Sequence, residues 1–291
     1  MKNQLVQPGP QKVWGWPAVV NFIFGGAATG FFLLSVLTVK LYESGTNGPF
    51  QPGPYKLLAP ILVVVGLLCL TIEAGRLSRG IYLLRNLSTS WISRETFAAI
   101  IFVPSTIIDW LHPHSGLLAL SVLAAVVFVI SQAYIIYRAR GVTAWNVSII
   151  PFVFTTSSFV TGGGILLSMK MSTFPRFLLL ICIICLALNL IVWLFYLYWP
   201  HENTFREATE VLRRPKPLFV TIGIGHLLPF ILLLWILLRP VAENLSEPSN
   251  IFIPMAAMAM IAGSAYQKIE IILRAGIQRG FSIEGGRAAI C

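Results

Sequence analysis

The sequence predicts an all-α integral membrane protein with eight transmembrane helices, arranged as two four-helix bundles. Hydrophobic residues make up 56% of the 291 residues and only 11% are charged, whereas soluble domains carry about 25% charged residues. The mean hydropathy is +0.79, and the apolar residues gather into runs long enough to cross a bilayer. This composition excludes a soluble globular enzyme, a disordered chain and a fibrous repeat.

The segment before the first apolar run, Met1 to Gln11, is polar and rich in proline. It lacks the charged region, the short apolar core and the A-x-A site of a cleaved signal peptide. We therefore expect the first apolar run to be retained as a span. The connections between the runs are too short for a soluble domain, so residues 1–291 are expected to form a single polytopic membrane domain.

Eight apolar runs approach the roughly 20 residues that a membrane helix needs. In chain order they are Trp16–Leu41, Leu57–Arg76, Thr96–Leu111, Leu117–Tyr137, Val147–Ser168, Phe177–Tyr198, Leu218–Leu238 and Ile251–Leu273. Prolines mark several of the helix starts, where a missing N–H costs little; they are Pro54, Pro60, Pro175, Pro217 and Pro254. The third run is the shortest. The connections on either side of the fourth run are short, which requires antiparallel neighbours.

In a soluble protein, a net charge of +10 would suggest binding to nucleic acid. In a membrane protein, the question is which side of the membrane carries the positively charged residues. With eight spans, both termini share one side. That side carries 16 of the 21 cations, namely Lys2, Lys12, Arg76, Arg79, Arg85, Arg94, Arg138, Arg140, Arg206, Arg213, Arg214, Lys216, Lys268, Arg274, Arg279 and Arg287. The other five are Lys40, Lys56, Lys170, Arg176 and Arg239. The positive-inside rule then predicts cytoplasmic termini, and the positive charge no longer indicates a nucleic-acid partner.

Ionisable and polar residues gather near the cytoplasmic ends of the predicted spans. They are Asn21, Glu73, Arg76, Arg94, Glu95, Gln132, Tyr134, Tyr137, Lys268, Glu270 and Arg274. One interpretation is local ion pairing with side chains that reach the interface. The other is a functional site, because ionisable groups at membrane depth are costly. Five different helices contribute, which favours a site for the set as a whole.

Three kinds of residue lie elsewhere. His226 falls near the middle of the seventh span, Asp109 near the far end of the third, and His112 and His114 in the loop that follows. His226 is either a proton-relay group or a core histidine bonded to a neighbouring hydroxyl. A membrane b-type haem needs two histidines at matching depth on facing helices, and only His226 is deep, so no haem is expected.

No metal site is expected either. The four cysteines are Cys69, Cys182, Cys185 and Cys291, and three of them lie inside apolar runs. Cys182 and Cys185 form a C-x-x-C in the middle of a predicted helix, which indicates buried thiols rather than ligands of zinc or an iron–sulfur cluster.

Two clusters of small residues allow close helix contact. The first span contains Gly26-x-x-x-Gly30, and the fifth contains Thr161-Gly162-Gly163-Gly164. Helix packing explains both clusters. The alternative for the second cluster is a broken helix that lines a substrate site, as in secondary transporters.

The stretch from Glu73 to Glu95 carries the most specific motif, Ser90-Trp91-Ile92-Ser93-Arg94-Glu95. Supporting features are Gly25-Gly26-Ala27-Ala28-x-Gly30, Gly225-His226-x-x-Pro229 and the ending from Lys268 to Phe281. In these features the chain resembles, over essentially its whole length, the membrane anchors of molybdopterin oxidoreductases, the dimethyl sulfoxide reductase anchor and polysulfide reductase anchor (NrfD-like) superfamily. Many relatives carry His-Leu-Gly where this chain has Glu73-Ala74-Gly75, so a carboxylate replaces a histidine implicated in quinol chemistry.

The resemblance implies a haem-free, metal-free anchor subunit in an electron-transport complex of anaerobic respiration. Such anchors bind a quinone, either menaquinone or ubiquinone, between helices near the subunit side. Their partners are a four-cluster-type iron–sulfur subunit and a molybdopterin catalytic subunit with Mo or W, expected here on the cytoplasmic side. The anchor itself is a non-catalytic or quinone-reactive subunit.

The resemblance and the level of the polar residues together give candidate site residues. Candidates for quinone binding and proton exchange are Asn21, Glu73, Arg76, Glu95 and Tyr134. Candidates for partner docking are Arg85, Trp91, Arg94 and Arg274. His226 and Asp109 are candidates for a proton route, which a redox-driven proton pump would need. A different class of function is a secondary transporter, with a broken-helix substrate site and Asp109 as the coupling carboxylate.

Overall fold

A computed structural model of the chain describes residues 4–6, 9–11, 14–45, 55–74, 84–169, 175–198, 203–239, 248–278, 281–284 and 287–290. The long helices are α1 (Trp16–Gly45), α2 (Tyr55–Ala74), α3 (Trp91–Leu111), α4 (Ser115–Tyr137), α5 (Ile150–Ser168), α6 (Arg176–Tyr198) and α10 (Pro248–Ile269). A further rod is continuous through α8 (Pro215–Leu218), the π-helix η3 (Phe219–Leu227) and α9 (Leu228–Leu237). Short helical pieces are α7 (Asn203–Ala208), η2 (Glu210–Arg213) and the π-helix η4 (Glu270–Arg274).

The protein is an all-α, multi-pass membrane protein. Within the described residues, six helical segments are long and apolar enough to cross a bilayer, and α2 supplies a shorter apolar helix, Tyr55–Thr71. The six segments are Trp16–Leu41, Trp91–Leu111, Ser115–Tyr137, Ile150–Ser168, Arg176–Tyr198 and Pro215–Leu237. Helix α10 runs alongside them and packs on α5, η3 and α9.

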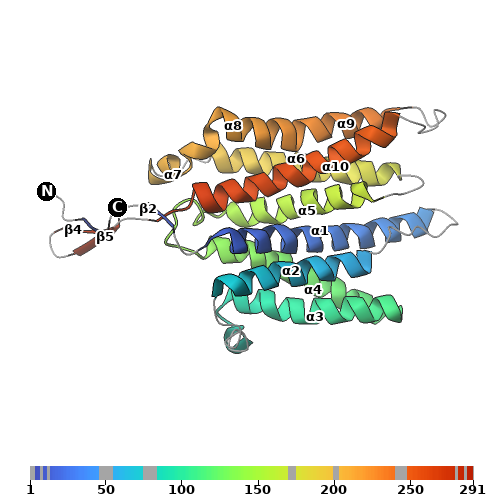
Figure 1. Cartoon of the computed structure of the whole chain (residues 1–291), viewed down its shortest axis with the longest axis horizontal. Helices are drawn as coiled ribbons and strands as arrows, with labels where there is room; N and C mark the ends of the chain where they lie inside the picture. Colours follow the sequence, from blue (N-terminus) through green and yellow to red (C-terminus); the bar gives the residue numbers. More distant parts are fainter. Residues whose placement is uncertain are drawn as a thin grey trace.

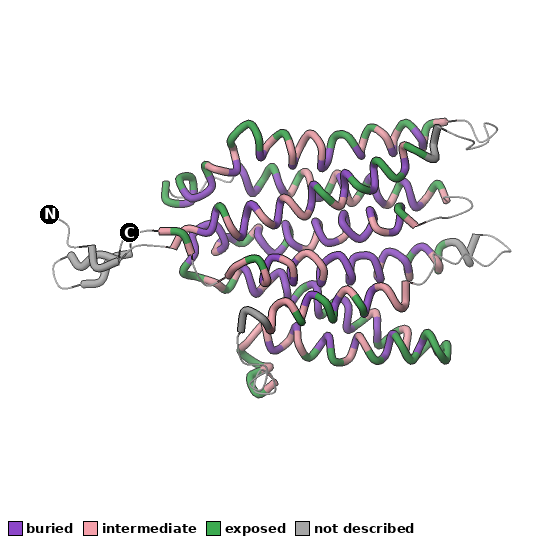
Figure 2. Tube along the Cα trace, viewed as in Figure 1, coloured by how far each residue is buried: buried purple, intermediate pink, exposed green. Residues whose placement is uncertain are grey.

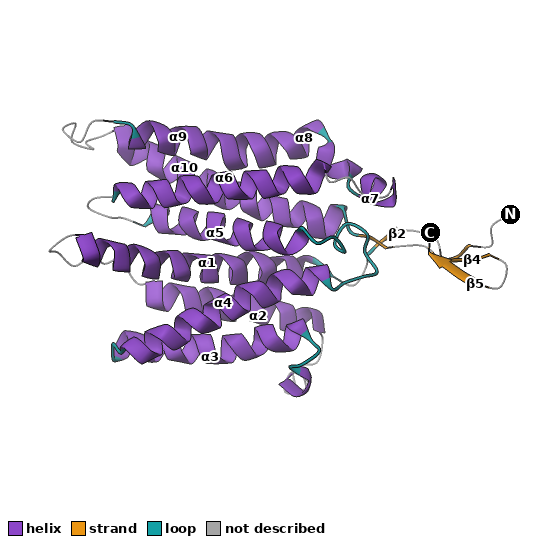
Figure 3. Cartoon of the chain, turned by 180° about the vertical axis from the view of Figure 1, so that it is seen from behind, coloured by secondary structure: helices purple, strands orange, loops and turns teal. Residues whose placement is uncertain are grey.

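The rods lie side by side and alternate in direction (Figure 1). We call the end where α1 begins and η4 finishes the terminal end, and the opposite end, where α3 ends and α4 begins, the far end. Helices α1 to α4 pack on one another, and α5, α6, α9 and α10 pack on one another. Helix α1 joins the two groups through its contacts with α5 and α10. The view from behind shows the same order of helices (Figure 3).

Most predicted helix starts differ from the structure by a few residues, and the differences at α3 and α5 have clear local causes. Helix α3 begins at Trp91 rather than Thr96, because the Ser90 hydroxyl accepts a hydrogen bond from the Ser93 N–H and caps the helix. Helix α5 begins at Ile150 rather than Val147, because Pro151 has no N–H and is tolerated only in a first turn.

The glycine run in α5 does not break the helix, so the broken-helix alternative is wrong. Gly162, Gly163 and Gly164 are all buried within a continuous α-helix. A Cβ on Gly162 would collide with the backbone of Gly30 and Phe31 in α1. The run therefore brings two helix backbones together, which is the small-residue packing seen between membrane helices.

Short strands, which the sequence analysis did not predict, lie at the terminal end. Strand β2 (Gly9–Pro10) pairs with β3 (Ile277–Gln278), and β1 (Gln4–Val6) pairs with β4 (Phe281–Glu284), which pairs with β5 (Arg287–Ile290). The pairing is antiparallel throughout. It brings the beginning and the end of the chain together beside the same face of the helix bundle (Figure 1).

Buried and exposed residues alternate along the helices, and the buried ones are most frequent on the central helices α1 and α5 (Figure 2). The buried apolar residues form two clusters, one toward the far end and one toward the terminal end. Between them, most of the long helices carry a buried polar residue. These residues, which we call the polar layer, are Asn21, Glu95, Ser131, Gln132, Ser157, Ser158, Asn189, His226, Ser264, Gln267 and Lys268.

Candidate functional site: a buried carboxyl group in the polar layer

The Glu95 carboxyl group lies at the centre of a hydrogen-bonded network between three helices. Glu95 of α3 is fully buried. Its Oε1 accepts a hydrogen bond from Asn21 Nδ2 of α1 at 3.1 Å and another from Gln132 Nε2 of α4 at 3.1 Å. Gln132 Nε2 also donates to the Asn21 carbonyl oxygen at 3.0 Å. The two amides therefore hold one carboxyl oxygen in a fixed position.

The other side of this network is left without partners. Glu95 Oε2 and Asn21 Oδ1 are buried and make no hydrogen bond within the part of the chain that the structure describes. In the same described part, no cation lies within ion-pair distance of Glu95. Buried polar atoms are nearly always bonded, and each exception calls for an explanation. Two unpartnered oxygens in one network are a feature that a polar ligand could satisfy.

Glycines make room for the network. A Cβ on Gly25 would lie 2.6 Å from Gln132 Nε2, and a Cβ on Gly66 of α2 would lie 3.1 Å from Asn21 Oδ1. Any larger residue at Gly25 would displace the amide that holds Glu95. The Gly25-Gly26 pair of the sequence motif thus permits the site as well as helix packing.

An aromatic stack borders the network at the terminal end. The rings of Trp91 and Tyr134 stack with centroids 4.5 Å apart, and the Arg94 guanidinium lies 4.2 Å from the Trp91 ring centroid. Arg94 donates to the carbonyl oxygens of Leu87 at 2.8 Å and Ser88 at 2.6 Å. Arg94 therefore fastens the preceding loop to the start of α3 and does not pair with the neighbouring Glu95.

A buried lysine lies on the opposite side of α1. Lys268 of α10 is 1% exposed, and its Nζ donates to the Phe22 carbonyl oxygen at 3.0 Å and to Ser158 Oγ at 3.2 Å. A Cβ on Gly26 would lie 2.6 Å from this Nζ. Gly25 therefore faces the amide that holds the buried acid Glu95, and the adjacent Gly26 faces the buried base Lys268.

The other predicted residues of the terminal end fall into three groups. Arg85 is exposed in the connection before α3. Arg274 is half exposed, and its Nη1 lies 3.2 Å from Glu270 Oε1. Glu73 lies in the last turn of α2, but its side chain is outside the described residues, as is the whole of Arg76.

His226 belongs to a second network in the polar layer. Its Nδ1 lies 2.6 Å from the Thr221 carbonyl oxygen, and its Nε2 lies 2.7 Å from Asn189 Oδ1. Asn189 Nδ2 donates to Thr156 Oγ1 at 2.7 Å. A neutral imidazole donates from only one nitrogen, so both contacts form together only if the ring is doubly protonated or the Asn189 amide is turned round. Of the two interpretations, the structure favours a bonded core histidine, but its partner is an amide rather than a hydroxyl.

The π-helix around His226 has a local cause. The Leu228 N–H bonds to the Gly223 carbonyl oxygen, five residues earlier, and Pro229 follows with no N–H to donate. A Cβ on Gly225 would lie 2.8 Å from the Gly263 Cα of α10. This close crossing fixes the widened turn against α10 and directs His226 toward α6.

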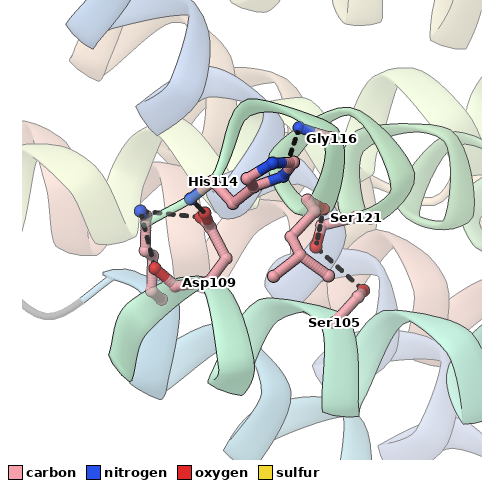
Figure 4. A network of polar contacts seen from close by, with 7 residues as sticks. Ser105, Asp109, His114, Gly116 and Ser121 are labelled. Carbon is pink, nitrogen blue, oxygen red and sulfur yellow. Dashed lines mark hydrogen bonds and ion pairs between the residues drawn. The ribbon is translucent and has the colours of Figure 1, made fainter. Parts of the chain in front are cut away.

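Asp109 lies at the far end, away from both networks. Its Oδ2 is 2.7 Å from Lys56 Nζ of α2, and its Oδ1 accepts from the His114 N–H at 2.9 Å. The His114 Nδ1 in turn accepts from the Gly116 N–H at 3.1 Å and caps α4 (Figure 4). Asp109 therefore joins three helices in a structural role. No chain of hydrogen bonds within the described residues links it to His226.

The sequence correctly placed Gln132 and Lys268 among the polar residues near the terminal end. It did not identify Asn189, Ser158 or Thr156 as members of the polar networks. Asn189 could have been found, because it is the only strongly polar residue between Phe177 and Tyr198. The two hydroxyl residues had no such signal, since serine and threonine often bond to their own helix backbone.

Comparisons with known proteins add no family. No protein-family model matches the chain, and no curated protein matches it.

Proposed function

We propose that this chain is the haem-free membrane anchor of a molybdopterin-type oxidoreductase complex. In this role it binds quinone or quinol and exchanges electrons with a peripheral iron–sulfur subunit. The observation that carries the proposal is the buried Glu95 carboxyl group, held through one oxygen by two amides while the other oxygen has no partner. The Ser90–Glu95 motif, through which the chain resembles such anchors, contains this carboxyl group.

The two unpartnered acceptor oxygens fit a quinol. Glu95 Oε2, when ionised, and Asn21 Oδ1 are hydrogen-bond acceptors, and both lack partners. When bound, a quinol supplies two hydroxyl donors and, on oxidation, two protons and two electrons. Glu95 accepts a proton in its ionised form and donates one in its protonated form, which is what a general acid–base group must do.

The neighbouring residues have separate roles in this proposal. Asn21 and Gln132 donate hydrogen bonds to Glu95 Oε1. These bonds fix the orientation of the carboxyl group, and so the position of Oε2. The stacked rings of Trp91 and Tyr134 would form an aromatic wall beside the site. Glu73 and Arg76 remain candidates for proton exchange at the end of the second span.

We also infer the membrane arrangement. Helices α2 and α10 would complete eight spans, in two four-helix bundles, in a prokaryotic inner membrane. The cations of the terminal end would place both termini in the cytoplasm. Arg85, Arg94 and Arg274 would then face an iron–sulfur subunit and, beyond it, a subunit with Mo or W.

Purification of the tagged full chain from its native membrane tests the complex. We expect an iron–sulfur protein and a molybdenum or tungsten protein to co-purify, with quinone in the solvent extract. Glu95→Gln should reduce the extracted quinone, whereas Asp109→Asn, at the far end of the same helix, should not. A solitary chain that contains neither partner nor quinone would refute the proposal.

The transporter alternative predicts a different result, namely solute flux into liposomes that contain this chain alone. Its motivating feature was a broken helix at Thr161–Gly164, and α5 is continuous there. Its coupling carboxylate, Asp109, is engaged by Lys56 and the His114 N–H. The redox-driven proton pump remains an extension of the anchor proposal, and proton uptake by His226→Ala proteoliposomes during turnover would test it.

A further inference from the structure

The hydrogen bonds around Glu95 determine which polar atoms remain available to a ligand. Gln132 Nε2 donates to the Asn21 backbone carbonyl oxygen at 3.0 Å and to Glu95 Oε1 at 3.1 Å. A backbone carbonyl oxygen can only accept a hydrogen bond, so the amide nitrogen of Gln132, and not its oxygen, must face it. Glu95 Oε1 therefore receives one hydrogen bond from an amide whose orientation is fixed.

The Asn21 amide is oriented by the same carboxyl oxygen. Its Nδ2 donates to Glu95 Oε1 at 3.1 Å, because turning the amide round would place its oxygen against the carboxyl oxygen. Glu95 Oε1 thus accepts two hydrogen bonds, which fills its two lone-pair positions. Asn21 Oδ1 and Glu95 Oε2 are left over. Both residues are at most 1% exposed, and neither oxygen has a partner in the described residues.

The two remaining oxygens differ in what they can do. Asn21 Oδ1 is an amide oxygen, which accepts hydrogen bonds and never donates them. Glu95 Oε2 also accepts when the carboxyl group is ionised. When the group is protonated, its hydrogen lies on Oε2, because Oε1 already accepts two hydrogen bonds. The site therefore offers one permanent acceptor and one atom that changes from acceptor to donor with a single proton.

A glycine of the neighbouring helix leaves the permanent acceptor uncovered by a side chain. Gly66 of α2 lies beside Asn21, and a Cβ at this position would be 3.1 Å from Asn21 Oδ1. A methyl group there would press against the oxygen and take the place of a hydrogen-bond donor. Position 66 therefore provides a way to block this acceptor without changing Asn21 or Glu95.

We propose that the site is selective for the reduced, hydroxyl-bearing form of a quinone, and that Asn21 Oδ1 supplies the permanent part of this selectivity. The inference rests on the proposed function at Glu95. A quinol has hydroxyl donors for both unpartnered oxygens, whereas a quinone has only carbonyl acceptors and leaves Asn21 Oδ1 buried without a partner. A site built to bind a hydroxyl group discriminates strongly against an analogue that lacks it, because its own polar groups then stay unpaired.

Anaerobic binding measurements on the full chain, purified from its native membrane, test the proposal. The probes are a menaquinone with one isoprenoid unit and its hydroquinone, and the readout is the ratio of their dissociation constants. We expect the hydroquinone to bind at least about tenfold more tightly, since one buried acceptor left unpaired costs about that factor. A redox titration of the bound pair should then give a midpoint potential at least about 30 mV above that of the free pair, which is the same tenfold ratio for a two-electron couple.

Three variants assign the selectivity to named atoms. In Glu95→Gln, an oxygen must still face the two amide donors, so the new Nε2 lies at the Oε2 position and donates. We expect the hydroquinone to bind more weakly and its preference to disappear. Gly66→Ala, which covers Asn21 Oδ1, should lower the preference about tenfold. Asp109→Asn makes a matched carboxyl-to-amide change at the far end of α3 and should leave the ratio unchanged.

Equal binding of the two redox forms by the wild-type chain, or tighter binding of the quinone, would overturn this inference while leaving quinone binding at Glu95 intact. An unchanged ratio in Gly66→Ala would remove Asn21 from the explanation and would also overturn it. Binding of neither form would instead refute the proposed function itself. If Glu95→Gln cannot be purified, the wild-type ratio and the Gly66→Ala variant still decide the question.

Discussion

Helix α3 carries a buried carboxyl group near each end, and the two are held in opposite ways. Asp109, at the far end, lies 2.7 Å from a lysine nitrogen and accepts a backbone N–H. Glu95, at the terminal end, is held through one oxygen by two neutral amides, and its other oxygen has no partner in the described residues. The first arrangement stabilises a charge, whereas the second leaves one oxygen of a buried carboxyl group without a partner in the described residues.

The surroundings of the two groups differ in the same way. Around Asp109, helix caps and an ion pair satisfy nearly every polar group, as expected of a structural contact. Around Glu95, glycines open space and acceptors stay unpaired, although a buried unsatisfied polar group costs about 1–3 kcal/mol. Such a departure from full satisfaction is typical of functional sites.

The largest expected effect separates the two carboxyl groups by function. In the complex, Glu95→Gln should lower quinol turnover at least about 100-fold, because general acid–base catalysis commonly contributes that much. Asp109→Asn should change turnover less than about twofold, because it acts far from the proposed proton transfer. A quinol-oxidation assay on both variants measures this difference. Equal loss in the two would remove the functional distinction.

In a stability measurement we expect the opposite ranking, with a larger loss of stability in Asp109→Asn than in Glu95→Gln. Asp109→Asn leaves Lys56 without its carboxylate and should lower the free energy of unfolding by about 2 kcal/mol. Glu95→Gln removes no ion pair and should leave the apparent Tm in detergent nearly unchanged. Adding Lys56→Met to Asp109→Asn should restore part of the loss, since the unpaired cation is then gone. A double variant no more stable than Asp109→Asn alone would contradict the ion-pair role.

A glycine substitution tests whether the geometry around Glu95 matters as well as its chemistry. In Gly25→Ala, the new methyl group would meet Gln132 Nε2 at 2.6 Å, so the amide must move away from Glu95. We expect roughly tenfold slower quinol turnover, which corresponds to about 1.4 kcal/mol. Gly223→Ala is the control, because its nearest side-chain atom lies at 3.4 Å. Matching rates for Gly25→Ala and wild type would show that Gln132 is not needed.

The smallest effect concerns the cap that starts α3. Ser90→Ala removes the acceptor for the Ser93 N–H and should cost about 1 kcal/mol of stability. Ser88→Ala is a matched control, because Ser88 uses only its backbone carbonyl to bind Arg94. Thermal unfolding of both variants measures the difference. Identical apparent Tm values would mean that Arg94 alone holds the start of the helix.

The positions of most helices could be predicted from the apolar runs, because a bilayer requires long apolar helices and little else. The residues at which the helices begin were harder to predict. Because Ser90 caps the helix, α3 begins five residues earlier than predicted. Because of Pro151, α5 begins later than predicted. The terminal strands are only two to four residues long, and so short a pattern does not distinguish a strand from a loop.

The candidate site was predictable only in part. The level of Asn21, Glu95 and Gln132 follows from where each lies in its apolar run. Their bonding does not, because Asn21 and Glu95 are 74 residues apart and nothing local fixes which helix faces point inward. The ion pair of Asp109 was missed for a similar reason. Its partner, Lys56, lies on a helix that the sequence does not place beside Asp109.

The contacts of α1 have a consequence for how the protein is made. Helix α1 is synthesised before α10, yet Lys268 of α10 bonds to the Phe22 carbonyl oxygen across 246 residues. At about 5–20 residues per second, synthesis of that interval lasts roughly 12–50 s. The glycine face of α1 lacks α5 for about half of this time and lacks α10 for all of it. Helix α1 must therefore remain in the bilayer, or beside an insertion factor, until α10 has been made and can pack against it.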